Sequence, residues 1–262
     1  MAAPVLRPLS TGEVLDVSFG LYRALFFPLV MVAAVSRAIP LVMSLYLQPG
    51  NIDQDPMAGM NMLVNRWPLF MASLVLGLVA NAFAVASTTS LVSAAYLGHA
   101  ITPKTALARA AGVIPQLIIV SFLFAISVGL GLLVLIVPGV ILWCGLVLGS
   151  VALILEQPVG PIDAMSRSWE LTKGFRGKVF VTMFVAYLFL LIPTMIVGVV
   201  AGIGAFVGTW PPMVTAVLTG ILQIFAYPFL YVVYTVLYYD LRVRKEGYDL
   251  ELLATTATHP AG

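Results

Sequence analysis

Long apolar runs constrain this chain more than any other feature of its sequence. The charged residues gather in four short stretches, separated by apolar runs long enough to cross a membrane as helices. Such a helix needs about 20 consecutive apolar residues, because the hydrocarbon core of a bilayer is ~30 Å thick. Only 9% of the 262 residues are charged, against about 25% in soluble globular chains. The sequence therefore predicts an all-α integral membrane protein and argues against a water-soluble fold.

The apolar runs predict six transmembrane helices. Four of them are expected at residues 26–47, 69–97, 179–207 and 214–238. The remaining run, 116–155, is too long for one crossing, and we expect Pro138-Gly139 to divide it into two helices. Taken in chain order, the six helices form three predicted hairpins.

A short amphipathic stretch precedes each predicted hairpin. The first opens with Ser10-Thr11-Gly12-Glu13, which has the form of a capping box, and extends to about residue 22. The second covers residues 102–111, and the third covers 161–173 and ends at Gly174. We expect these stretches to be interfacial helices that lie on the cytoplasmic side of the membrane.

The second and third amphipathic stretches share the pattern Pro-x-x-Ala-[Leu/Met]-x-Arg, at residues 103–109 and 161–167. With the N-terminal stretch as a divergent first copy, this pattern predicts repeat units at about 8–97, 102–155 and 160–238. The predicted organisation is a single polytopic membrane domain over residues 1–254, with a cytoplasmic C-terminal tail over 239–262.

The distribution of Lys and Arg predicts the orientation of the chain. These residues concentrate in the N-terminal segment, in the loops after the second and fourth predicted helices, and in the C-terminal segment, whereas the opposite side holds only Arg66. Because cytoplasmic loops carry an excess of Lys and Arg, both termini are expected to be cytoplasmic.

Catalytic and metal-binding patterns are absent from the sequence. His99 and His259 have no Cys, His or carboxylate at ligand spacing, and there is no phosphate-binding glycine loop or nucleophile elbow. Cys144 lies alone inside an apolar run. We therefore expect no enzyme activity, no cofactor, no metal and no nucleic-acid partner.

Three polar residues in or beside the apolar runs are candidate intramembrane sites: Arg37, Asn81 and Glu156. Arg37 is expected either to bind an anion or lipid headgroup, or to pair with a helix carbonyl or lie near the interface. Asn81 is expected either to line a polar pathway or to form an interhelical hydrogen bond. Glu156 is expected to form an ion pair with the amphipathic stretch that carries Arg167 and Lys173, with proton coupling as the alternative.

A tyrosine stripe and a basic cluster are candidate contacts for lipids or partners. The stripe is Tyr227, Tyr231, Tyr234 and Tyr238, whose spacing places four phenols on one helical face. It is expected to grip a lipid or cofactor, or to pack against another helix. The cluster consists of Arg167, Lys173, Arg176 and Lys178 just inside the membrane, and Trp169 among them is a further candidate contact. Topological anchoring, lipid recognition and docking of a cytoplasmic partner are the roles that it allows.

Glycines near the end of the fifth predicted helix form two successive Gly-x-x-x-Gly pairs. These glycines are Gly198, Gly202, Gly204 and Gly208. Small residues at this spacing let two helices approach closely inside a membrane. They therefore predict a helix-packing face.

Several motifs of this chain resemble those of a known family. They are residues 7–16, Pro138-Gly139 with the apolar run after it, Glu156, the stretch 164–174 (Ala-Met-Ser-Arg-Ser-Trp-Glu-Leu-Thr-Lys-Gly) and the stretch 239–249. Together they resemble the bacterial glycerophosphoryl diester phosphodiesterase membrane-domain family over nearly the whole chain. The resemblance implies a stand-alone membrane portion, without a catalytic barrel, in the bacterial cytoplasmic (inner) membrane.

The sequence predicts a non-catalytic inner-membrane protein, because packing motifs are abundant and catalytic patterns are absent. The expected role is a scaffold or accessory subunit that binds membrane lipids, other membrane proteins or a second copy of itself. The alternative is a transporter or permeation pathway for a small amphiphile or lipid, which the repeated hairpins, Arg37 and the glycine-rich helix favour.

Overall fold

The computed structural model describes residues 7–46, 58–98, 102–156, 159–207 and 212–248. Of these residues 91% are helical and none lies in a strand. The helices are α1 (Thr11–Ala24), α2 (Phe26–Tyr46), α3 (Ala58–Tyr96), α4 (Pro103–Val134), α5 (Ile136–Leu146), α6 (Gly149–Leu155), α7 (Pro161–Thr172), α8 (Arg176–Phe206) and α9 (Pro212–Glu246). This composition confirms the predicted all-helical class.

Six helical segments of the described chain are long and apolar enough to cross a membrane. They are Phe26–Met43, Arg66–Tyr96, Ala110–Val134, Ile136–Leu155, Arg176–Gly204 and Met213–Glu246. Their number agrees with the six helices predicted from the apolar runs.

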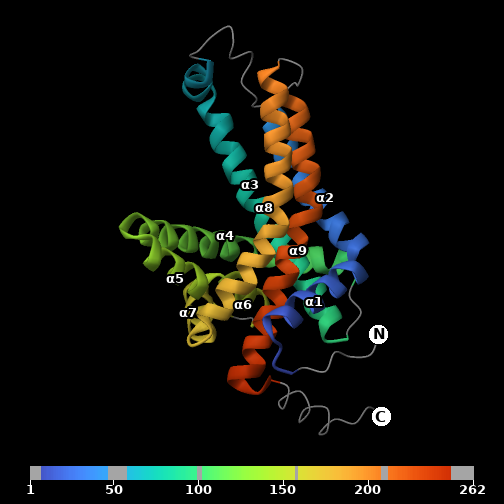
Figure 1. Cartoon of the computed structure of the whole chain (residues 1–262), viewed down its shortest axis with the longest axis vertical. Helices are drawn as coiled ribbons and strands as arrows, with labels where there is room; N and C mark the ends of the chain where they lie inside the picture. The colour runs from blue at the N-terminus through green and yellow to red at the C-terminus, as the bar shows by residue number, and fades with distance from the viewer. Residues whose placement is uncertain (1–6, 47–57, 99–101, 157–158, 208–211, 249–262) are drawn as a thin grey trace.

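The long helices run in two directions. Figure 1 shows α2, α3, α8 and α9 along the long axis of the molecule, whereas α4 and α5 lie across them and project to one side. We call the first four helices the bundle, and α4 with α5 the arm. Length and composition do not distinguish the arm from the bundle, but its direction does.

The structure contains the helix start predicted for α1 and the helix stop predicted for α7. The Ser10 side chain accepts a hydrogen bond from the Glu13 N–H (3.3 Å), and the Ser10 N–H donates to the Glu13 carboxylate (2.7 Å). This reciprocal capping box starts α1. Gly174 follows α7 with φ +89°, a left-handed conformation that favours glycine and ends the helix.

The break within the 116–155 run lies at Leu135, three residues before the predicted Pro138-Gly139. Leu135 is extended (φ −162°, ψ 154°) between α4 and α5. Pro138 falls in the first turn of α5, where its missing N–H costs no helical hydrogen bond. Gly139 instead permits close packing of the arm, because a Cβ atom there would lie 2.4 Å from Leu132 Cδ2.

The second predicted amphipathic stretch is not a separate helix. Residues 103–111 are the first turns of α4, which continues through Pro115 to Val134. At the other end of the chain, the predicted start of the tail at residue 239 falls inside α9. Tyr239, Asp240 and Leu241 are buried there.

Helix α7 docks where α5 gives way to α6. Ser168 Oγ donates to the Gly145 carbonyl (2.8 Å) and accepts from the Leu148 N–H (3.2 Å). These bonds satisfy backbone groups at a point where the helix is interrupted. The Trp169 ring covers Gly145 so closely that a Cβ atom there would lie 2.3 Å from it.

Candidate functional site

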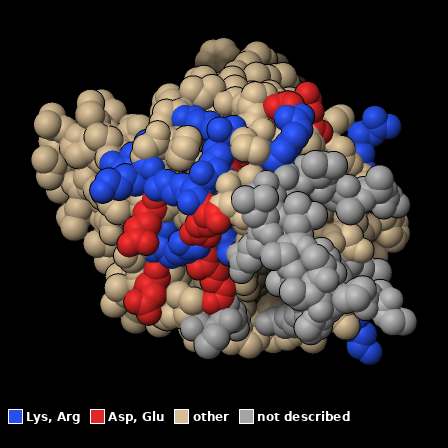
Figure 2. Space-filling model, turned by 90° about the horizontal axis from the view of Figure 1, so that it is seen from below, with Lys and Arg blue, Asp and Glu red and all other residues tan. Residues whose placement is uncertain are grey.

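Charged side chains gather at one end of the molecule, the lower end in Figure 1. Seen from below in Figure 2, Lys and Arg interleave with Asp and Glu on this face. We call this region the charged end, and its paired residues are Arg7, Glu13, Glu156, Arg167, Lys178, Asp240, Arg242, Arg244 and Glu246. Opposite charges therefore largely neutralise one another on this surface.

Glu156 lies at the centre of one ion network. Both of its carboxylate oxygens lie 2.9 Å from Arg167 Nε, and Tyr238 donates a hydrogen bond to it. Arg167 also pairs with Glu246 (2.5 Å). Burial alone would lower the pKa of Arg167, but hydrogen bonds to Glu246 and Glu156 outweigh burial and raise that pKa. The structure thus brings Glu156 to Arg167, the partner expected from the sequence.

Asp240 is the centre of a second network, which the sequence analysis missed. Its side chain is fully buried and accepts from the Leu9 N–H (2.7 Å). Lys178 pairs with it from α8, and Arg244 Nε lies 3.1 Å from Asp240 Oδ1. The i,i+4 spacing of Asp240 and Arg244 was the available signal. Because Asp240 falls in the predicted cytoplasmic tail, this spacing is not predicted to be part of a helix.

The remaining members of the predicted basic cluster either contact other residues of the chain or are exposed. The Arg176 guanidinium lies over the Trp169 ring, 3.8 Å from its centroid, which is a cation–π geometry. Lys173 is exposed. Since Arg167 and Lys178 pair with carboxylates, this arrangement favours anchoring of α7 and α8 over recognition of anionic lipid.

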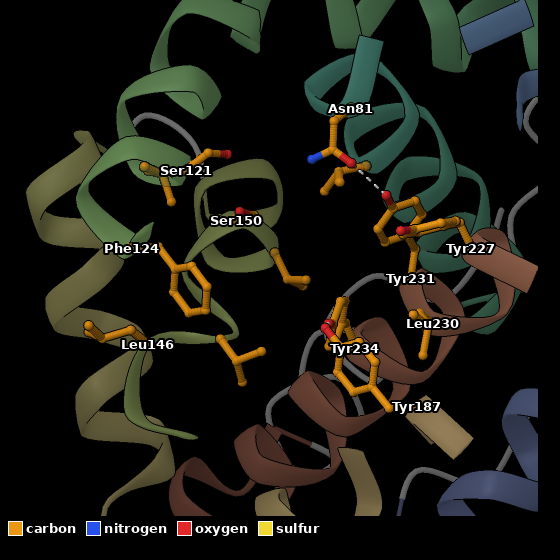
Figure 3. A pocket seen from close by; sticks show the side chains of 14 residues that line it. Asn81, Ser121, Phe124, Leu146, Ser150, Tyr187, Tyr227, Leu230, Tyr231 and Tyr234 are labelled. Atoms are coloured by element: carbon orange, nitrogen blue, oxygen red, sulfur yellow. Dashed lines mark hydrogen bonds between the residues drawn. The ribbon is translucent and has the colours of Figure 1, made fainter. Parts of the chain in front are cut away.

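A cavity of about 240 Å³ lies between the arm and the bundle. We call it the arm–bundle cavity. Figure 3 shows α4 and the α5–α6 segment on one side of it, and α3 and α9 with Tyr187 of α8 on the other. The lining residues are Asn81, Val85, Val120, Ser121, Phe124, Leu146, Val147, Ser150, Val151, Tyr187, Tyr227, Leu230, Tyr231 and Tyr234.

The bundle wall of this cavity is polar. Tyr231 donates a hydrogen bond to Asn81 Oδ1 (2.8 Å), and the Tyr187 and Tyr234 hydroxyls lie 2.7 Å apart. Three residues of the predicted tyrosine stripe line the cavity: Tyr227, Tyr231 and Tyr234. The fourth, Tyr238, donates a hydrogen bond to Glu156 instead. Sequence reasoning missed Tyr187, Ser121 and Ser150. Each lies alone in an apolar run, and no spacing signal marks it.

Arg37 of α2 packs against Tyr227 of α9. Its guanidinium carbon is 4.3 Å from the Tyr227 ring centroid. Arg37 also lines a second cavity of about 390 Å³ between α2 and α9, together with Thr219 and Gln223. We call it the outer cavity. The Arg37–Tyr227 contact therefore joins a residue of the outer cavity to a residue of the arm–bundle cavity.

The predicted glycine face of α8 has open space at two of its glycines, Gly198 and Gly202. No atom of another element lies within 4 Å of a Cβ built at Gly198 or Gly202. Gly204 is buried, and Gly208 lies outside the described residues. His99 and His259 also lie outside them. Within the described ranges, no group of three or more His, Cys, Asp or Glu side chains is placed to hold a metal ion.

One comparison identifies a family. Residues 61–239 match the model of an uncharacterised protein family, UPF0259. No curated protein and no solved structure matches the chain. The resemblance to the glycerophosphoryl diester phosphodiesterase membrane-domain family is therefore wrong, since no comparison points to it. The motifs behind it have structural uses in this fold: the capping box starts α1, and Ser168, Trp169 and Gly174 dock and end α7.

Proposed function

We propose that this chain, which belongs to the uncharacterised family UPF0259, is a non-catalytic accessory subunit or scaffold. In this role it binds a transmembrane helix of another membrane protein. The observation that carries the proposal is the open glycine face of α8. Gly198 and Gly202 leave their Cβ positions free, and no neighbouring element of the described chain fills them.

The surroundings of these glycines support a helix as the occupant. Met195, Val199 and Ile203 are each about 60% exposed (62%, 61% and 62%) and follow one another at i, i+4 spacing beside the glycines. In the apolar 18-residue stretch that qualifies each span, 11% of the residues of α8 are buried, against 44% for the span Ile136–Leu155. Inside a membrane, small residues at this spacing allow close backbone contact between helices. A helix of a partner protein therefore fits this face.

The test is affinity purification from native membranes in mild detergent, with mass spectrometry of the bound proteins. We expect a stoichiometric membrane-protein partner that falls about tenfold in the Gly198→Leu/Gly202→Leu double variant, the effect of ~1.4 kcal/mol. Gly77→Leu on α3 is the control, because its Cβ position is equally open. A partner retained by the double variant, a second copy alone, or lipid alone would each contradict the proposal.

We further propose an orientation in which the charged end faces the cytoplasm of a bacterium and both termini lie there. The concentration of Lys and Arg supports it. The α1–α2–α3 and α7–α8–α9 segments then form hairpins with interfacial first helices, and the arm enters from the same side. Labelling of Met213→Cys from outside the cell, and of Lys173→Cys only after permeabilisation, is expected in a Cys144→Ala background. The reverse pattern rejects this orientation.

A second candidate is permeation of a small amphiphile. The observation that favours it is the Arg37–Tyr227 contact, whose two residues line the outer cavity and the arm–bundle cavity. In this case Arg37→Leu is expected to change flux in proteoliposomes at least severalfold. Flux equal to that of empty vesicles removes this candidate.

A further inference from the structure

We propose that the arm–bundle cavity binds a single-chain amphiphile whose head carries carbonyl or carboxyl oxygens. The site goes beyond the docking role of α8 and does not depend on it, because the glycine face does not line the cavity. Three steps lead to this ligand class: the depth of the cavity, the donors on its polar wall, and its size.

The polar wall lies at mid-membrane depth. Asn81 is the central residue of the candidate span Arg66–Tyr96, and its side chain reaches the cavity. Polar groups at this depth are expensive and mark functional sites more often than they do near the interfaces. Packing between helices accounts for the Asn81–Tyr231 hydrogen bond, but not for a cavity beside it.

The polar wall has hydrogen atoms to donate. Because Asn81 Oδ1 accepts from Tyr231, the amide nitrogen is available for another group, and Figure 3 shows it turned toward the cavity with the Tyr227 hydroxyl. Tyr187 and Tyr234 share one hydrogen bond, which leaves one hydroxyl hydrogen between them. No Asp, Glu, Lys or Arg is among the lining residues of the described chain. The wall thus suits a head rich in acceptors and gives an ammonium head no counter-charge.

The opposite wall and the volume select a single chain. Phe124 and Leu146 present apolar side chains from the arm, and Val120 and Val147 add to this wall. Ser121 and Ser150 are the polar residues on this side. The volume of about 240 Å³ is below the ~300 Å³ at which pockets for drug-sized ligands begin. A two-chain phospholipid exceeds this space. One aliphatic chain or one ring, with its oxygens against the bundle wall, fits it.

The experiment uses the full chain in nanodiscs with a photoactivatable octanoic acid and, in a second arm, a photoactivatable quinone with a single isoprene unit, because longer chains would exceed the cavity. These probes share acceptor oxygens and a single chain but differ in charge, so their relative labelling distinguishes carboxyl from carbonyl heads. Peptide mapping is expected to place the adducts on α3, α4 and α9 around the cavity. Asn81→Leu should reduce them about fivefold, the effect of losing ~1 kcal/mol from one hydrogen bond.

Two further variants keep the result decisive. Phe124→Trp fills the cavity from the arm and should also reduce labelling, whereas Ser73→Leu on α3 should not, because Ser73 does not line the cavity. Thermal melting identifies any variant that fails to fold, and Phe124→Trp then replaces Asn81→Leu. Adducts spread over all lipid-facing residues, or equal labelling in every variant, would overturn the site. If no membrane-protein partner depends on Gly198 and Gly202 while labelling of the cavity is intact, only the docking role is rejected.

Discussion

The two halves of α9 belong to regions that are held together differently. At the charged end, the helix is buried almost continuously from 228 to 243, and Asp240 and Arg242 join networks that reach α6, α7, α8 and the segment before α1. In the other half, residues 213–227 include no buried residue, and the outer cavity adjoins the helix. Between the open half and the charged end, the arm–bundle cavity contacts Tyr227, Tyr231 and Tyr234. The charged end is held by many ionic contacts, whereas the walls of the arm–bundle cavity are held by single hydrogen bonds, Tyr231–Asn81 and Tyr187–Tyr234. We call the region around the two cavities the mid-membrane region, after the depth proposed for Asn81.

This difference indicates that the two regions have different roles, one in fixing the fold and one in binding. Buried charge pairs favour one arrangement of the helices, because an arrangement that separates the partners leaves an uncompensated buried charge. Single hydrogen bonds within a membrane contribute much less, on average ~0.6 kcal/mol. The charged end is therefore suited to set the arrangement of the helices, and the mid-membrane region is suited to admit a ligand. Four predictions test this contrast.

The largest effect is expected at Asp240. In Asp240→Asn, Lys178 and Arg244 lose their buried counter-charge, so the free energy of unfolding should fall by about 3–5 kcal/mol. Titration with sodium dodecyl sulfate in mixed micelles measures this change. Glu170→Gln is the control because its side chain is exposed. A loss at Asp240 no greater than in this control would remove the distinction between the two regions.

The next effect is expected in the arm, at Gly139. A Cβ atom there would meet Leu132, so Gly139→Val should cost about 1–3 kcal/mol through overpacking. Gly129→Val, on the same arm but with open space around it, should unfold like the wild type. The same unfolding titration compares the two variants. Equal stability of both would show that α4 and α5 are not packed as closely as described.

A smaller effect is expected at the cavity wall. Tyr231→Phe removes the donor to Asn81 Oδ1 and leaves the ring in place, so the loss should be ~0.6 kcal/mol. A loss as large as that of Asp240→Asn would show that the mid-membrane region is also held by a strong polar network. The contrast between the charged end and the cavity wall would then fail.

The smallest effect is a pH dependence at the start of α1. The Ser10 N–H, followed by the Arg7 side chain, stabilises the Glu13 carboxylate and lowers its pKa from 4.5 to about 2. Because the folded pKa is the lower one, this contribution is present above pH 4.5 and is lost as the pH falls toward 2. Melting temperatures of the wild type and Glu13→Gln should converge over that window. A constant difference between them would contradict the assignment.

Parts of the fold and of the candidate sites follow from local patterns. The capping box at Ser10, the stop at Gly174 and the six apolar segments depend on residues close in sequence, which is why reasoning from period and composition finds them. Arg37 and Asn81 stand out because polar side chains are rare in apolar runs. Tyr187 and Ser121 do not, since a phenol or hydroxyl within a helix becomes part of a site only through its neighbours on other helices.

The sequence by itself determined that this protein is helical and membrane-embedded, because the solvent imposes length and polarity on every spanning segment. Only the tertiary structure decided that the arm lies across the bundle, that α9 continues into a buried charged end, and that Asn81 and four tyrosines line a cavity. The reason is physical. Hydropathy depends on each residue's own side chain, whereas helix direction, ion pairing and cavities depend on contacts between segments far apart in the chain.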